Sequence, residues 1–145
     1  MAIDQDNVIR VRKTFAAPVV AVYGLCASKD LFDFCGVEVE SGSCDVRVGG
    51  KYSYKVDADD FLSGEFRAIE PQRRLAFTWL TMGLDGPTGE TLVTLTFQDD
   101  DGRCKVELEH GGIKHRKTAK AHDEAWVEIF EAMAEELADE DGEAE

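Results

Sequence analysis

Residues 118–137, TAKAHDEAWVEIFEAMAEEL, are the stretch that decides the fold. Apolar side chains recur there at spacings of three and four, at Ala125, Trp126, Ile129, Phe130, Met133 and Leu137. Many of the other positions are acidic, namely Glu124, Glu128, Glu131, Glu135 and Glu136. This spacing predicts a helix with one buried stripe and a back that faces water. At a rise of 1.5 Å per residue the helix is about 30 Å long, roughly one small-domain diameter.

Most of the chain before this helix alternates apolar and polar residues, which is typical of strands with one buried face. Such segments are residues 8–15, 37–39, 44–48, 51–56, 61–69, 74–80, 91–98 and 104–110. Turn-forming residues separate them at 49–50, 57–60, 70–73, 82–89 and 99–102. Short helices are predicted at 19–26 and 29–34, with Ser28 as the N-cap of the second.

A sheet with one apolar face must cover that face, and the terminal helix carries the matching stripe. The sequence therefore predicts an α+β fold, in which a curved antiparallel sheet of six or seven strands wraps around a long C-terminal helix. Two short helices follow the first strand. The 145 residues fit one domain. We expect residues 1–138 to form it and residues 139–145 to be an acidic tail.

Composition excludes several classes of partner. The net charge of −14 argues against nucleic acid or an anionic membrane, because both need a basic face. No apolar run approaches the roughly 20 residues of a membrane span, and the N-terminus lacks the pattern of a signal peptide. The four cysteines show no zinc or thioredoxin spacing, so we expect reduced thiols, no metal and a cytoplasmic location.

A set of short motifs occurs in a specific order along the chain. They are TFAAP at 14–18, DVRVGG at 45–50, GEF at 64–66, IEP at 69–71, RLAFTW at 74–79, ETLVTLTF at 90–97, and His122 four residues before Trp126. Together they resemble the homologues of the activator of heat-shock-protein-90 ATPase, a branch of the START-like, or SRPBCC, superfamily of helix-grip domains. The resemblance covers about residues 8–138.

The resemblance implies a helix-grip fold with a cavity between the curved sheet and the long helix. Across the superfamily such cavities hold apolar small molecules, lipids or polyketides, and a few members are cyclases or hydrolases. The branch shares no catalytic residues that can be carried onto this chain, and no cofactor is implied. Relatives often have tryptophans in the short second helix, where this chain has Asp33-Phe34-Cys35-Gly36.

Large side chains on the inward faces are the candidate lining of that cavity. From the strands these are Tyr52, Tyr54, Phe66, Phe77, Trp79, Leu108 and His110, and from the helix His122, Trp126 and Phe130. Apolar walls with a few polar tips are what small-molecule pockets need. The alternative is that the same residues fill an ordinary core. On the helix, Ile129, Met133 and Leu137 are expected to seal dry core.

The candidates for catalysis are few. His110 and His122 can meet at one end of the cavity, where a histidine pair could act as general base or bind a metal. The alternative is two buried histidines that hydrogen-bond to the backbone. Nucleophile-elbow, phosphate-binding and dinucleotide-binding motifs are absent from the sequence.

Three functions therefore stay open. The first is a non-catalytic module that binds a hydrophobic or aromatic small molecule. The second is a cyclase- or hydrolase-like enzyme that uses the cavity histidines. The third is a co-chaperone-like partner of a heat-shock ATPase, which exposed apolar surface on the outer face of the sheet would favour. A homodimer is a further possible assembly.

Overall fold

The computed structural model describes residues 7–56, 61–81 and 90–142, with side chains as far as residue 137. In chain order the elements are β1 (Ile9–Phe15), α1 (Val19–Cys26), α2 (Lys29–Phe34), β2 (Glu38–Cys44), β3 (Lys51–Lys55), β4 (Phe61–Glu70), β5 (Arg74–Thr81), β6 (Thr91–Asp100), β7 (Arg103–Gly111) and α3 (Arg116–Gly142). The predicted turns at 57–60 and 82–89 lie outside the described residues.

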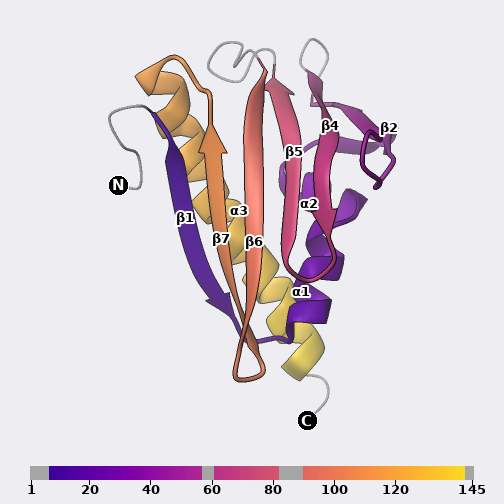
Figure 1. The fold of residues 1–145 in the computed structure, drawn as a ribbon, viewed down its shortest axis with the longest axis vertical. Helices are drawn as coiled ribbons and strands as arrows, with labels where there is room; N and C mark the ends of the chain where they lie inside the picture. Colours follow the sequence, from indigo (N-terminus) through magenta and orange to yellow (C-terminus); the bar gives the residue numbers. More distant parts are fainter. Residues whose placement is uncertain (1–6, 57–60, 82–89, 143–145) are drawn as a thin grey trace.

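The strands form one seven-stranded antiparallel sheet in the order β1-β7-β6-β5-β4-β3-β2. Helix α3 crosses one face of this sheet obliquely, and α1 and α2 lie on the same side (Figure 1). From β2 to β7 each strand pairs with the next strand along the chain, whereas β1 pairs with β7. The predicted α+β helix-grip fold, with two short helices after the first strand, is therefore confirmed.

Helix α2 begins where the sequence predicts. The Ser28 hydroxyl accepts a hydrogen bond from the backbone N–H of Asp30 at 3.2 Å, which satisfies one of the free donors of the first turn. The helix buries Leu31 and Phe32 against the sheet. Its C-terminal end is followed by Gly36, whose φ of +85° is a conformation that favours glycine.

The prediction for residues 37–48 is partly wrong. Two short strands were expected at 37–39 and 44–48, but the structure has the single strand β2 followed by a turn. The Asp45 carboxylate accepts a hydrogen bond from Arg47 at 2.6 Å, and the Gly50 N–H donates to the Arg47 carbonyl at 2.7 Å. Val46 and Val48 are exposed in this turn, so their alternation reflects no buried strand face.

Helix α3 is longer than predicted, because it begins at Arg116 and ends at Gly142. Trp126, Phe130 and Met133 of the predicted stripe are buried. Ala125, by contrast, is exposed to solvent, because it lies at the edge of the stripe. None of the helices in the described part of the chain combines the length and apolar character that a membrane crossing requires.

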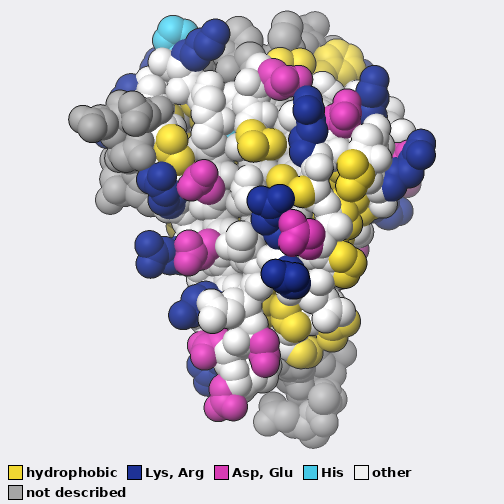
Figure 2. All heavy atoms as spheres, in the orientation of Figure 1, with side chains coloured by type: hydrophobic (Ala, Val, Ile, Leu, Met, Phe, Trp, Pro, Cys, Tyr) yellow, Lys and Arg dark blue, Asp and Glu magenta, His cyan; other side chains and the backbone are white. Residues whose placement is uncertain are grey.

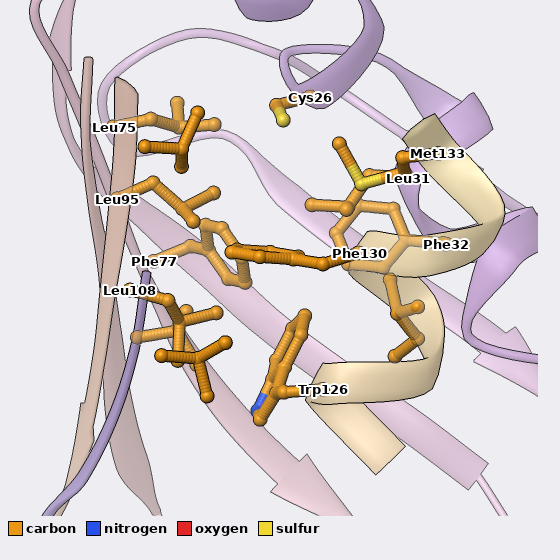
Figure 3. Close-up of a cluster of buried hydrophobic side chains, with 14 of the residues drawn as sticks. Cys26, Leu31, Phe32, Leu75, Phe77, Leu95, Leu108, Trp126, Phe130 and Met133 are labelled. Atoms are coloured by element: carbon orange, nitrogen blue, oxygen red, sulfur yellow. The ribbon is translucent and has the colours of Figure 1, made fainter. Parts of the chain in front are cut away.

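The core lies between the sheet and the helices. Leu75, Leu95 and Leu108 project from neighbouring strands toward α3 (Figure 3). Phe130 of α3 meets them from the other side, and its ring packs edge-on against Phe15 of β1 with centroids 5.8 Å apart. This packing fixes how far α3 stands from the sheet, and so how much space remains beside it.

Candidate functional site

The part of the predicted cavity that faces β3, β4 and β5 is filled. Phe32 of α2 stacks on Tyr52 with ring centroids 4.3 Å apart, and it also packs against Tyr54 at 5.6 Å and Phe77 at 5.8 Å. Phe66 completes this group through Tyr52 and Phe77. Phe32 was not among the predicted residues, although the apolar pair at 31–32 behind a capping serine is a signal that could have found it.

An open pocket of about 110 Å³ remains between α2 and α3. Its lining consists of Cys35, Trp79, Ala121, His122, Ala125, Trp126 and Ile129. Of the predicted residues, the structure brings Trp79, His122 and Trp126 together here, whereas Leu108, His110 and Phe130 are buried behind them. That these residues bind a ligand stays a prediction.

The mouth of the pocket is made by residues that the sequence analysis did not select. Ala125 is exposed, and Cys35 and Ala121 are half-buried. Cys35 caps the C-terminal end of α2. The small side chains at these positions leave the passage between the two helices open.

A chain of hydrogen bonds links the two tryptophans behind the pocket. The Trp126 indole N–H donates to Nδ1 of His110 at 3.1 Å. The other ring nitrogen of His110, Nε2, lies 2.8 Å from the Thr91 hydroxyl oxygen. Thr91 in turn donates to the Trp79 carbonyl at 2.7 Å. Because the indole can only donate, Nδ1 of His110 must accept, and Nε2–H therefore donates to Thr91.

This arrangement holds His110 as a neutral ring. Burial lowers the pKa of His110 well below its usual value, and the neighbouring His122 lowers it further. Both ring nitrogens are already engaged, so His110 can gain a proton only by losing the bond from Trp126. The geometry suits a positioning role better than that of a general base.

His122 lies beside His110, with ring centroids 5.5 Å apart and the rings nearly perpendicular. Its Nδ1 is 2.9 Å from the Thr118 carbonyl oxygen, one helical turn earlier, so Nδ1 carries the proton and donates. The structure therefore brings the two candidate histidines together and gives each a defined hydrogen bond. Within the described residues, no group of three or more His, Cys, Asp or Glu is placed to hold a metal ion.

Side chains, rather than the strand ladder alone, hold β5 in place where it supplies Trp79. The Tyr52 hydroxyl reaches across β4 and donates to the Thr78 carbonyl at 2.6 Å, and the backbone N–H of Glu65 donates to the Thr78 hydroxyl at 2.8 Å. Gly64 makes this crossing possible, because a Cβ there would lie 1.9 Å from the Thr78 carbonyl oxygen. The wall of the pocket between α2 and α3 thus depends on a glycine that is not part of its lining.

The indole N–H of Trp79 takes no part in the hydrogen bonds described above. It is buried, and no described residue accepts a hydrogen bond from it. The Trp79 ring packs against Trp126 at 5.0 Å and against His110 at 5.6 Å between centroids. A buried donor without an acceptor is unusual and calls for an explanation.

Charged and small side chains alternate on the outer face of the sheet, which Figure 2 shows from the front. Cross-strand pairs occur there, for example Arg10 with Glu109 at 3.4 Å and Arg74 with Glu70 at 2.9 Å. Leu92 is an exposed large apolar side chain on β6. Shallow hollows on this face are wide and open, and they are bordered by such charges.

Comparison with known proteins decides the family. The family model described as "Activator of Hsp90 ATPase homolog 1-like protein" matches residues 16–138. The chain belongs to this family. The resemblance inferred from the sequence motifs is therefore confirmed, and the match runs from α1 to residue 138 of α3.

Proteins of known structure share the fold at low sequence identity. CalU16 from Micromonospora echinospora is 23% identical with a TM-score of 0.70, and the match covers 94% of this chain and 84% of that one. DynU16, from the dynemicin biosynthetic locus, is 21% identical with a TM-score of 0.74 over 92% of this chain and 48% of that one.

An Hsp90 activator from Plasmodium falciparum, PFC0360w, is a more distant structural relative. It is 19% identical with a TM-score of 0.56, and the match covers 73% of each chain. No curated protein matches the sequence. At these identities the structural likeness establishes the fold and leaves the function to be argued from the site.

Proposed function

We propose that this protein binds a small, mostly apolar molecule in the pocket between α2 and α3, without converting it chemically. The observation that carries the proposal is the open pocket walled by Trp79, His122 and Trp126. Concave apolar surface with a few polar groups is what small-molecule sites require. We place this binding in the cytoplasm, which the four free thiols support.

The size of the pocket limits what enters it. Its volume of about 110 Å³ is below the roughly 300 Å³ at which drug-sized ligands are enclosed. An apolar cavity of about 150 Å³ holds a benzene ring. The pocket is smaller than that cavity but open at its mouth, so it suits part of one aromatic ring or a short chain, with the rest of the molecule lying across the mouth beside Ala121 and Ala125.

We propose that no chemical conversion occurs because both ring nitrogens of His110 are engaged in hydrogen bonds within the protein. A general base needs a nitrogen lone pair that faces the substrate, whereas the lone pair of His110 already accepts from Trp126. His122 lines the pocket and donates its Nδ1–H to the Thr118 carbonyl, so its role is tested directly by substitution. Replacement of His122 by Gln should change the ligand affinity by no more than a few-fold relative to the wild type. Any turnover that the wild type shows should persist in this variant.

Blocking the mouth tests the proposal. Ala125→Phe adds a ring at an exposed position of the mouth, whereas Val127→Phe adds the same ring at an exposed position outside the pocket lining. We expect lipophilic compounds to shift backbone amide resonances beside Trp79 and Trp126 in the wild type and in Val127→Phe, and to shift them far less in Ala125→Phe. If no compound shifts these resonances in the wild type, the proposal is wrong.

A chaperone link is the second candidate, because the family description names an activator of Hsp90 ATPase. The outer face of the sheet gives this candidate limited support, because charged pairs such as Arg10 and Glu109 separate the apolar side chains on it. The described apolar side chains on this face therefore do not form one continuous patch (Figure 2). A pull-down with a purified heat-shock ATPase tests it. Absence of binding would remove this candidate without affecting the pocket.

A further inference from the structure

We propose that the end of the ligand that enters the pocket carries an uncharged hydrogen-bond acceptor, such as a ketone, ester or amide carbonyl, and that the indole N–H of Trp79 binds it. This inference rests on the proposed function and names the chemical class of the ligand. It follows from which polar groups around the pocket are already matched and which are not.

The Trp79 side chain is 4% exposed, and its N–H has no acceptor among the described residues. A buried donor costs stability unless it is satisfied, and natural proteins leave few of them. Trp79 also lines the pocket, so a ligand enters beside it. An acceptor brought by the ligand would recover the lost hydrogen bond.

Three acceptors in this part of the core already accept a hydrogen bond. Nδ1 of His110 accepts from Trp126, the Thr118 carbonyl accepts from His122, and the carbonyl of Trp79 itself accepts from Thr91. Nδ1 of His110 has a single lone pair, so its bond from Trp126 would have to break before it could serve the Trp79 N–H. His110 is therefore not an inexpensive internal partner for this donor.

Charge selects a neutral acceptor over a carboxylate. Among the described residues no Lys or Arg lines the pocket, and the exposed side of α3 next to the mouth carries Glu124 and Glu128. An unpaired anion placed here would lose its hydration without gaining a counter-ion. A carbonyl oxygen accepts a hydrogen bond without that loss.

The shape of the walls favours a flat group beside the acceptor. The Trp79 and Trp126 rings lie 5.0 Å apart between centroids with an interplanar angle of 50°, and the mouth is lined by alanine side chains. Aromatic faces gain most from stacking with another planar group. An aryl or conjugated ketone combines both features.

Three probes of similar size separate these contributions: acetophenone, ethylbenzene and benzoate. The isotope-labelled full chain contains two tryptophans, so its spectrum holds two indole N–H resonances. One is already hydrogen-bonded to His110, and the other belongs to Trp79. Trp79→Phe removes the second resonance and assigns it, and through-space contacts to neighbouring side chains assign it if that variant does not fold.

We expect acetophenone to move the Trp79 indole resonance downfield and to bind about tenfold more tightly than ethylbenzene, as one hydrogen bond to a buried donor predicts. Benzoate should bind more weakly than either. In Trp79→Phe the preference for acetophenone over ethylbenzene should disappear.

The outcomes distinguish this inference from the function on which it rests. If acetophenone and ethylbenzene bind with equal affinity and the Trp79 resonance does not move downfield, the proposal that the ligand carries a hydrogen-bond acceptor is wrong. The proposal that the pocket binds apolar molecules is then unaffected. If benzoate binds most tightly, the requirement for an uncharged ligand is wrong. If none of the three probes shifts resonances beside Trp79 and Trp126, the pocket does not bind small molecules and both proposals fall.

Discussion

The indole nitrogen of Trp126 lies 3.1 Å from Nδ1 of His110, and this bond joins α3 to β7 inside the core. Both side chains are almost fully buried. The bond fixes which nitrogen of His110 accepts, and through Thr91 it reaches the backbone of β5. One side chain of the long helix therefore sets the position of three strands at the back of the pocket.

Loss of this bond should destabilise the fold. Trp126→Phe keeps an aromatic ring but leaves Nδ1 of His110 without a donor and removes buried surface. We expect the free energy of unfolding to fall by about 2–4 kcal/mol in urea denaturation. Val127→Ala, at an exposed neighbouring position of the same helix, should change it by less than about 0.5 kcal/mol. Equal effects of the two substitutions would contradict this role for the bond.

The Thr91 hydroxyl should matter more than its methyl group. Thr91→Val keeps the shape of the side chain but leaves Nε2–H of His110 and the Trp79 carbonyl without this partner. The expected loss of unfolding free energy is about 1–3 kcal/mol, because both groups are buried. Thr96→Val is the matched control, since Thr96 is exposed on the same strand. A neutral result at position 91 would mean that the hydrogen-bond chain does not stabilise the protein.

Acid should weaken the fold through His110. In the unfolded chain this ring takes up a proton near pH 6.5, whereas burial and His122 lower its pKa well below that value in the folded chain. The unfolded state therefore binds more protons below about pH 6.5, and the unfolding free energy falls by at most about 1.4 kcal/mol per pH unit until the folded pKa is reached.

Urea denaturation at about pH 7.5 and about pH 5.5 measures this slope. His110→Gln should flatten it, because Gln supplies an acceptor and a donor but does not titrate. Asp123 acts in the opposite direction, since burial raises the pKa of its carboxyl and the folded state then takes up that proton first. An unchanged slope in His110→Gln would assign the pH dependence to other groups.

Two glycines should respond oppositely to the same substitution. A Cβ at Gly64 would meet the Thr78 carbonyl oxygen at 1.9 Å and the Tyr52 ring at 2.7 Å, so Gly64→Ala must displace β4 from β5. We expect a loss of at least about 2 kcal/mol and altered Trp79 fluorescence. Gly24 lies inside α1, and outside the backbone of that helix no described residue comes within 4 Å of its Cβ position, so Gly24→Ala should stabilise by about 0.5–1 kcal/mol. Stabilisation at Gly64 would refute the close approach.

The periodicity of the sequence was enough to predict the elements and the fold. The spacing of Trp126, Phe130 and Met133 identified the buried stripe, and the alternation in β3, β5, β6 and β7 identified the inward faces. These patterns are local, because a helix or strand repeats its facing with a fixed period. Residues 37–48 show the limit: Val46 and Val48 alternate like a strand, but the Asp45–Arg47 bond and Gly49-Gly50 form a turn.

Which inward residues would line a pocket could not be read from the sequence, because packing and lining use the same apolar side chains. That choice depends on where α2 docks. Phe32 fills the space beside Tyr52 and Phe77, and the small residues Cys35 and Ala121 leave a gap beside Trp79. The sequence determined which side chains face inward; only the tertiary structure decided which of them touch one another, since that contact joins elements far apart in the chain.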